Sequence, residues 1–255
     1  STVYGDPSHD LLVLGITGTN GKTTTSYLVD AGLRAAGLLT GVIGTVGTRI
    51  GDEIVPTVRT TPEATDVHAL LAVMRERGVR AVTMEVSSHA LRLGRVDGVR
   101  FDVAGFTNLS PDHLDFHTDM DDYFDAKAEL FSPARSERAV VCVDDEHGDA
   151  MARVAESHGL PTTTYAATRT DATWSVRDVR TVPGGSVLTA VGPGSELDLE
   201  VHLPGAFNVA NGLGALAMLA AIGIDPEVAA RGIGACPGVP GRMERVPDGD
   251  PQLHR

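Results

Sequence analysis

Aromatic residues are scarce in this chain, at 4% of its 255 residues, so we expect a core built mainly from aliphatic side chains. The two cysteines, Cys142 and Cys236, lack the spacing of a metal-binding pair, which predicts two free, buried thiols in a reducing compartment. Apolar runs fall short of the ~20 residues that a membrane-spanning helix needs, and no charged, apolar leader opens the sequence. These features predict a cytoplasmic protein without membrane contact.

Positive charge is also in short supply. Lysine and arginine number 21 against 34 acidic residues, which gives a net charge of −13. A nucleic-acid surface needs clustered positive charge to displace counterions, so we expect no nucleic-acid partner. A nucleoside triphosphate is compatible with this charge, because a few local groups are enough to hold one.

The chain does have a regular alternation of apolar runs and helical patterns up to about residue 170. We predict strands at 11–16, 41–45, 79–86, 101–107, 139–143 and 162–165, and helices at 22–36, 62–78, 120–130 and 148–158. Strands joined by crossover helices predict an α/β fold of the phosphate-loop type, a mostly parallel sheet with helices on both faces. Ligands on such sheets bind beyond the carboxyl ends of the strands.

The pattern changes between residues 172 and 203, where apolar and polar residues alternate. Segments rich in proline and glycine at 183–185 and 192–194 divide this stretch, so we predict a small three-stranded antiparallel sheet. Helices are expected again at 206–221 and 226–235, before a break rich in proline and glycine at 237–241.

A glycine-rich segment at 15–25 follows the first predicted strand and opens the first predicted helix. Backbone N–H groups of such a turn and the helix dipole point at one place, which predicts an anion site. Lys22 adds a mobile positive charge there, and Thr23 adds a hydroxyl that can bind Mg²⁺. The spacing departs from the standard phosphate loop, since Ile16 stands where the first glycine belongs. The alternative is a tight turn with an exposed lysine, but the three glycines and their context favour a nucleoside triphosphate site.

Polar residues also follow the third predicted strand. Glu85 ends that strand and is a candidate Mg²⁺ ligand, because hard cations prefer oxygen; the alternative is a solvated glutamate. Ser87-Ser88-His89 comes next, but the glycine-flanked turn of a serine hydrolase is missing. By position, His89 is a helix-start or packing histidine.

The segment 107–117 follows the fourth predicted strand. His113 and His117 are spaced to share a helix face, yet a zinc protease would need a glutamate where Leu114 stands. His113 is instead a candidate for contact with Mg²⁺ and phosphate. Ser110-Pro111 has the pattern of a helix N-cap. Lys127, on its own, is predicted to be a solvated lysine on a helix surface.

Taken together, these segments resemble the central domain of the Mur ligase family. Six motifs in order carry the resemblance: residues 18–23, 85–89, 108–115, 126–127, 207–211 and 241–244. The likeness covers nearly the whole chain. It is strongest to the members that add the third residue of the peptidoglycan stem peptide to UDP-N-acetylmuramoyl-L-alanyl-D-glutamate, with a diamino acid as the second substrate.

The resemblance implies ATP-dependent amide formation through an acyl phosphate, and it implies roles for individual residues. Catalysis would involve Lys22, Glu85, His113 and Lys127. ATP would contact Gly18, Thr19, Asn20, Gly21, Lys22, Thr23, Thr24, Asn208, Asn211 and Arg242. The UDP-linked dipeptide would contact Thr60, Thr61, Ser87 and Arg95. Mg²⁺ would be held by Thr23, Glu85, His113 and Lys127, the last of these carrying a carbamate. The local alternative for Thr60 and Thr61 is an N-cap before Pro62.

The chain departs from the family at Leu93, where a glutamine is common, so one substrate contact is in question. Residues 1–245 match one of three family domains, and 246–255 begin a linker; we expect the N-terminal UDP-binding and C-terminal domains to be absent and the isolated chain to form no amide. Two alternatives remain: a folylpolyglutamate-type ligase core and a non-catalytic nucleotide-binding module. The choice between meso-diaminopimelate and lysine is left open.

Overall fold

The computed structural model describes residues 2–56 and 59–240 of the chain. Within these residues, eleven strands form one sheet in the order β11-β10-β9-β8-β7-β6-β1-β5-β2-β3-β4. The strands are β1 (Leu12–Thr17), β2 (Thr40–Gly44), β3 (Gly47–Ile50), β4 (Glu53–Val55), β5 (Ala81–Glu85), β6 (Val103–Phe106), β7 (Ala139–Cys142), β8 (Thr162–Ala166), β9 (Trp174–Val182), β10 (Gly185–Gly192) and β11 (Ser195–Val201).

The centre of the sheet is parallel, as the sequence predicts. β1 lies between β5 and β6, with Leu14 opposite Thr83 on one side and Val103 on the other. Both faces of these strands are covered, which explains why they are continuous apolar runs rather than alternating ones. Their carboxyl ends therefore meet at one edge of the sheet.

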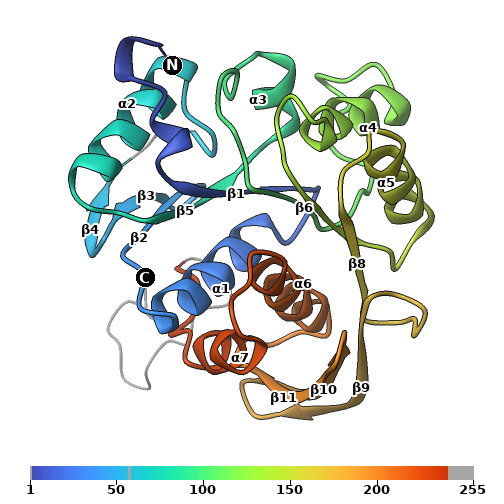
Figure 1. Cartoon of the computed structure of the whole chain (residues 1–255). Helices are drawn as coiled ribbons and strands as arrows, with labels where there is room; N and C mark the ends of the chain where they lie inside the picture. Colours follow the sequence, from blue (N-terminus) through green and yellow to red (C-terminus); the bar gives the residue numbers. More distant parts are fainter. Residues whose placement is uncertain (1, 57–58, 241–255) are drawn as a thin grey trace, which may run out of the picture.

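Helices cover both faces of this parallel part (Figure 1). On one face lie α2 (Ala64–Glu76), α3 (Ser88–Arg92), α4 (Met120–Ala128) and α5 (Glu146–Ser157); on the other lie α1 (Lys22–Ala35), α6 (Phe207–Ala221) and α7 (Pro226–Gly234). Short 3₁₀ turns occur at Thr2–Tyr4, Pro7–His9 and Glu129–Phe131. In the described part of the chain, none of these helices has both the length and the apolar character to cross a bilayer.

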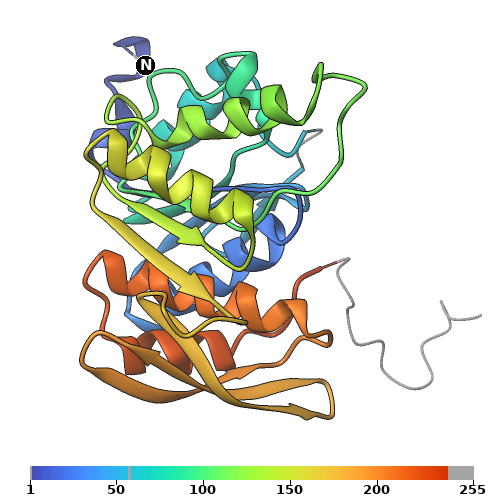
Figure 2. The ribbon, with the colours of Figure 1, turned by 90° about the vertical axis from the view of Figure 1, so that its right-hand side faces the viewer.

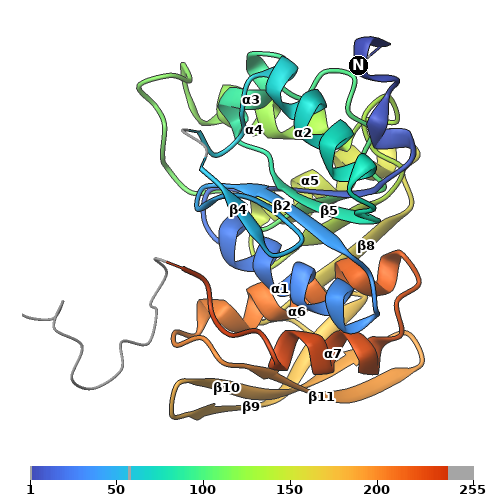
Figure 3. The ribbon, with the colours of Figure 1, turned by 90° about the vertical axis from the view of Figure 1, so that its left-hand side faces the viewer.

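The three antiparallel strands predicted near the C-terminus are present, but they continue the main sheet. β9 pairs in parallel with β8, where Tyr165 lies opposite Trp174, and then pairs antiparallel with β10. The sheet turns sharply at this point, so that β9–β11 lie on the outer side of α6 and α7 (Figures 2 and 3). The helices α1, α6 and α7 are thus enclosed between two parts of one sheet.

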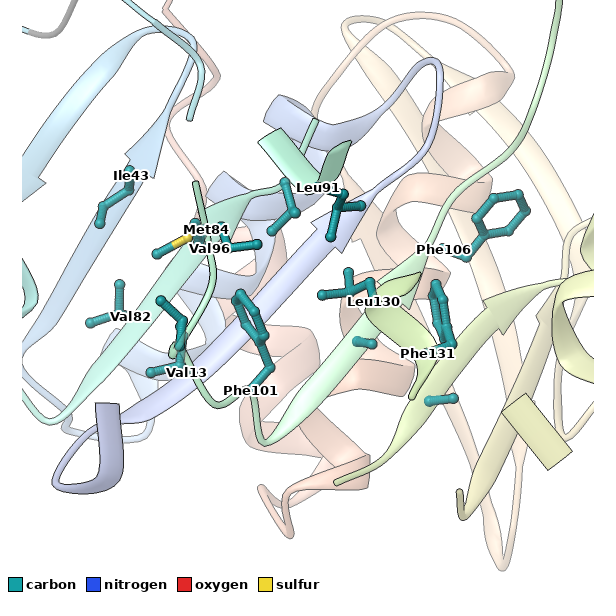
Figure 4. Packing of buried hydrophobic residues seen from close by; sticks show 14 of the residues in the cluster. Val13, Ile43, Val82, Met84, Leu91, Val96, Phe101, Phe106, Leu130 and Phe131 are labelled. Carbon is teal, nitrogen blue, oxygen red and sulfur yellow. The ribbon is translucent and has the colours of Figure 1, made fainter. Parts of the chain in front are cut away.

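Two apolar clusters fill the layers, one on each face of the sheet. Figure 4 shows part of the cluster under α2–α5, where the ring of Phe101 and the side chain of Met84 lie over the central strands. Gly15 of β1 leaves room for that ring, since a Cβ there would lie 2.7 Å from Phe101 Cδ1. Cys142 and Cys236 are buried and unpaired, which confirms the expectation of free thiols.

Two local expectations about helix starts are wrong. Ser110-Pro111 begins no helix; α4 starts at Met120 and is capped by Asp119. The reason is that the backbone N–H and C=O of Ser110 are both bonded to the hydroxyl of Thr19, at 3.0 and 3.2 Å, which ties this segment to the glycine-rich loop.

The second wrong expectation about a helix start concerns Thr60 and Thr61. The N-cap of α2 is Glu63 rather than either threonine. Thr61 instead donates its hydroxyl to the backbone oxygen of Glu85 at 2.8 Å, so it links the chain before α2 to the end of β5. The structure also contains the short strands β3 and β4, which the sequence pattern did not predict.

Candidate active site

A cavity of about 1200 Å³ lies at the edge where β1, β5 and β6 end. Most of the residues predicted for the site line it: Thr19, Asn20, Gly21, Lys22, Thr23, Thr24, Thr60, Thr61, Glu85, Ser87, Arg95, His113, Asn208 and Asn211. Gly18 and Lys127 lie outside the lining, and Arg242 lies outside the described residues. Segments up to about 190 positions apart therefore meet around one space.

The glycine-rich loop can adopt its shape only with glycine at two positions. Gly18 and Gly21 have φ values of 144° and 87°, which side chains rarely adopt. A Cβ at Gly18 would lie 1.9 Å from Thr107 Oγ1, and one at Gly21 would lie 2.4 Å from Asn211 Oδ1. The backbone thus approaches both neighbours closely and enters α1 at Lys22, and the first N–H groups of a helix have no partner within the helix itself.

The loop is fixed in place by the end of β6. Asn20 donates its backbone N–H to Asn108 Oδ1 at 2.9 Å, and Thr107 donates its hydroxyl to the Asn20 oxygen at 2.6 Å. Lys22 donates to the backbone oxygens of Gly18 and Thr19, at 2.7 and 2.9 Å, within its own loop. The positive charge of Lys22 is therefore held at the loop, where the sequence predicts it.

Glu85 and Thr23 form the second part of the site. The carboxylate of Glu85 is 1% exposed and accepts three hydrogen bonds: from Thr23 Oγ1 at 2.9 Å, from the Thr45 N–H at 2.8 Å and from Thr45 Oγ1 at 3.0 Å. A hydroxyl and a carboxylate side by side at a phosphate loop are the oxygen donors that Mg²⁺ prefers, so these residues fit a magnesium ion.

Thr45 was missed by the sequence analysis. It follows β2 directly, at the same sheet edge as Glu85, so the position of a hydroxyl after a strand was the available indication. Tyr123 and Arg59 were missed as well: Tyr123 contacts Thr19, which is distant in sequence, and Arg59 lines the cavity and pairs with Glu63, four positions further along.

His113 and His117 do not share a helix face. His113 has φ 53° in a turn and an imidazole that is 45% exposed, whereas His117 is buried. The ring of His113 meets that of His89 edge to face, with centroids 5.0 Å apart, and His89 stacks on Phe116. Burial, together with the charges of His113 and His117, lowers the pKa of His89. Among the described residues, no group of three His, Cys, Asp or Glu side chains is arranged to hold a metal.

A serine, a histidine and an aspartate do form a chain here, although not the one considered from sequence. His117 bonds Ser88 Oγ through Nε2 at 2.9 Å and Asp122 Oδ2 through Nδ1 at 3.1 Å. Ser88 is 1% exposed and lies outside the cavity lining, so its hydroxyl is not presented to a substrate. The arrangement joins the start of α3 to the start of α4.

Lys127 is one of the largest fully buried side chains, so the prediction from local sequence of a solvated lysine is wrong. Its Nζ lies 4.1 Å from the centre of the Tyr123 ring, and Tyr123 OH lies 3.1 Å from Thr19 Oγ1 in the loop. Burial, followed by the positive charge of Lys22, lowers the pKa of Lys127 from 10.5 to about 6. The local sequence pattern therefore gave no indication that this lysine is buried.

Helix α6 supplies the remaining wall. Asn208 and Asn211 are both buried; Asn211 donates to Asn208 Oδ1 at 2.8 Å, and Asn208 donates to the Pro204 oxygen at 2.8 Å. Because Asn211 also meets Gly21, this helix contacts the glycine-rich loop directly.

Residues 16–219 match the Mur ligase middle domain. The chain belongs to the Mur ligase family. Its similarity to the UDP-N-acetylmuramoyl-L-alanyl-D-glutamate--2,6-diaminopimelate ligase of Streptomyces avermitilis is 57% identity over 255 residues, covering 99% of this chain and 50% of the relative. This Mur ligase chain spans about half the length of the curated relatives it matches.

Solved structures agree with this assignment. A structure of a UDP-N-acetylmuramoyl-L-alanyl-D-glutamate--2,6-diaminopimelate ligase matches with a TM-score of 0.84 at 31% identity, covering 93% of the Mur ligase chain and 49% of the solved one. A folylpolyglutamate synthase from Mycobacterium tuberculosis matches with a TM-score of 0.78 at 19% identity, covering 93% and 61%. The second likeness is one of fold alone.

Proposed function

We propose that this Mur ligase chain is the ATP-binding core of a ligase that adds a diamino acid to UDP-N-acetylmuramoyl-L-alanyl-D-glutamate in peptidoglycan precursor synthesis. The relative at 57% identity is named for that UDP-linked dipeptide and for 2,6-diaminopimelate, which supports both substrates. Residues 1–245 would be the central domain and 246–255 the start of a linker. The half-length match to the relatives supports further domains that hold the UDP group and the amino acid.

One observation carries the proposal. The loop residue Lys22 and the pair Thr23–Glu85 line the same cavity as Thr60 and Arg95, the residues proposed to hold the dipeptide. A phosphate donor and a carboxylate acceptor can therefore meet in one cavity, which is the main requirement of phosphoryl transfer.

The chemistry then follows in two steps. A carboxylate oxygen of the dipeptide bonds to the γ-phosphorus of ATP while the bond from that phosphorus to the bridging oxygen breaks, and ADP leaves. Lys22 and the N–H groups at the start of α1 neutralise charge on the phosphate chain. The amine of the diamino acid next bonds to the carbonyl carbon, inorganic phosphate leaves, and the amine gives up a proton as the amide forms.

Thr23 and Glu85 would hold a magnesium ion, with His113 near a second one, and magnesium supplies charge neutralisation on the transferring phosphoryl group. Asn208 and Asn211 would contact the adenine end of the nucleotide, together with Arg242. The burial of both asparagines next to the loop supports this placement.

We also propose that Lys127 carries a carbamate. The neutral amine bonds to the carbon of carbon dioxide and loses a proton, so a buried neutral amine becomes an anion beside Lys22. Burial of the amine and its pKa of about 6 support this step, because the neutral form is the one that reacts. A mass increase of one carbon dioxide on Lys127 would test it, and an unmodified lysine in bicarbonate buffer would contradict it.

The two alternatives make different predictions. A folylpolyglutamate-type core would release more phosphate from ATP with folate than with the UDP-muramoyl dipeptide. A non-catalytic module would bind ATP without magnesium-dependent phosphoryl transfer. The residues Glu85, His113 and Lys127 have no role in such a module, which favours the ligase.

The test is therefore a comparison of phosphate release from ATP with the UDP-muramoyl dipeptide, with folate and with neither. We expect this chain by itself to bind ATP weakly and to form no amide product. We expect the UDP-muramoyl dipeptide, but not folate, to increase phosphate release from ATP. Robust amide formation would contradict the proposal that other domains are required, and stimulation by folate would contradict the substrate.

A further inference from the structure

Two arginines on the wall of the active-site cavity share one carboxylate. Arg95 Nη2 lies 3.2 Å from Glu63 Oε1, and Arg59 Nη1 contacts the same oxygen. Both arginines line the cavity beside Thr60, Thr61 and Ser87. Arg59 precedes α2, Glu63 is its N-cap residue, and Arg95 follows α3, so the cluster joins two helices that cover the same face of the sheet (Figure 3).

The positive charge of this cluster is only partly balanced. Two guanidinium groups face one carboxylate, which leaves one net positive charge in a chain whose overall charge is −13. The Arg95 side chain is 14% exposed, and among the described residues its Nε has no hydrogen-bond partner although it is buried. Burial, and then the charge of Arg59, lowers the pKa of Arg95, which is the direction expected for a cation that lacks compensation.

The carboxylate that the arginines share makes no capping bond to the first turn of α2, although Glu63 is the N-cap residue. It contacts the two arginines instead and is 50% exposed. An ion pair whose carboxylate is half exposed contributes little stability, so another oxyanion can displace it.

We propose that Glu63 is an internal placeholder, occupying a carboxylate subsite formed by Arg59 and Arg95 that takes a carboxylate of the bound peptide. This inference rests on the proposed function, since the proposed substrate is a dipeptide rich in carboxylates. Ligand entry exchanges one carboxylate for another on the arginine pair and leaves Glu63 free to turn toward solvent or toward the start of α2. Arg59 is then a specificity residue, and Glu63 lowers the affinity for the ligand.

The test is titration of the whole chain with L-alanyl-D-glutamate, followed by calorimetry or by NMR up to millimolar concentration. We expect Glu63→Gln to bind the dipeptide about five-fold more tightly than the unaltered chain, because the competing charge is gone. Arg59→Gln should bind it several-fold more weakly. The double variant Glu63→Gln/Arg59→Gln should lose most of the gain, because the gain requires the arginine that Glu63 had occupied.

Glu76→Gln is the matched control. Glu76 is an exposed acid at the end of α2, and it lines neither this cavity nor the neighbouring pocket that Arg59 and Glu63 line, so the variant makes the same charge change without freeing the arginines. An equal gain in Glu76→Gln would overturn the inference, as would unchanged or weaker binding by Glu63→Gln. Inorganic phosphate serves as the other oxyanion; a Glu63→Gln gain for phosphate and none for the dipeptide would overturn the assignment to a carboxylate.

Binding of ADP with Mg²⁺, measured on the same samples, separates this inference from the proposed function. Loss of nucleotide binding by the unaltered chain counts against the ligase core. If the chain binds ADP with Mg²⁺ but Glu63→Gln does not change the affinity for the dipeptide, the proposed role of Glu63 is wrong and the proposed ligase core is unaffected.

Discussion

The hydroxyl of Thr23 donates to Oε2 of Glu85 at 2.9 Å, although 62 positions separate the two residues in the sequence. The contact joins the first turn of α1 to the end of β5, and it brings together the two oxygen ligands proposed for magnesium. It also defines the part of the site most open to a direct test.

Glu85→Gln keeps the size of the side chain and removes its charge. We expect the increase in ADP affinity caused by Mg²⁺ to fall at least about ten-fold, while ADP binding without metal changes little, because Lys22 and the loop are intact. Calorimetric titration with and without Mg²⁺ measures both. Glu196→Gln, an exposed glutamate on β11, is the control. Equal metal dependence in Glu85→Gln and the unaltered chain would contradict this role.

Gly21→Ala tests the loop conformation. The φ of 87° alone should cost about 1 kcal/mol, and the added Cβ would also lie 2.4 Å from Asn211 Oδ1. Gly37→Ala is a close match, because its φ is 82° and nothing lies within 4 Å of its Cβ. Urea unfolding should give a larger loss for Gly21→Ala, and only this variant should lose ADP affinity. Equal losses in both variants would mean that the contact with Asn211 is unimportant.

Lys127 should make stability depend on pH. Between its folded pKa of about 6 and its ordinary value of 10.5, the unfolded chain holds a proton that the folded chain has lost, so this group makes the fold more stable as pH rises. Lys127→Met removes that dependence, by at most about 1.4 kcal/mol per pH unit, and should stabilise the fold most at the acidic end. Denaturant unfolding between about pH 6.5 and about pH 8.5, in buffer free of carbon dioxide, measures the slope. If the free energy of unfolding depends on pH equally in Lys127→Met and in the unaltered chain, this role of Lys127 is contradicted.

Phe101→Ala tests the packing seen in Figure 4, where the ring lies against the central strands. Phe101 is fully buried, and Gly15 offers no side chain to fill the space left behind. We expect a loss of about 3–5 kcal/mol in the free energy of unfolding. Val179→Ala, at a position that is 47% exposed, should change it by less than about 1 kcal/mol. A loss for Phe101→Ala as small as that of the control would show that the core relaxes around the cavity.

The sequence predicted the parts of the fold that repeat a strong local pattern. Continuous apolar runs gave the parallel strands, and the glycines at 18 and 21 gave the loop, because both features depend on neighbours in sequence. The short strands β3 and β4 were not predicted, since a segment of three or four residues is too short to show a period. The separate sheet expected near the C-terminus proved to be continuous with the first, because pairing of β8 with β9 depends on how the chain turns.

The site was predictable where a residue stands at a strand end, as Glu85 does. It was not predictable where the partner is far away. The helix pattern around Lys127 gives no indication of burial, which comes from Tyr123 and from the loop beneath it. The N-cap patterns at Ser110 and Thr61 misled for the same reason, because distant groups compete for the same atoms: the hydroxyl of Thr19 and the backbone oxygen of Glu85.

The turn of the sheet at β9 affects how far this protein can be shortened. Strands β9–β11 form the outer cover of α6 and α7, and α6 carries the asparagine that abuts the glycine-rich loop. Trimming residues 174–201 would expose Leu213, Leu216 and Ile233 to water and leave the loop without its backing. The smallest fragment able to bind a nucleotide must therefore extend well past β8, even though none of β9–β11 contributes a residue to the cavity wall.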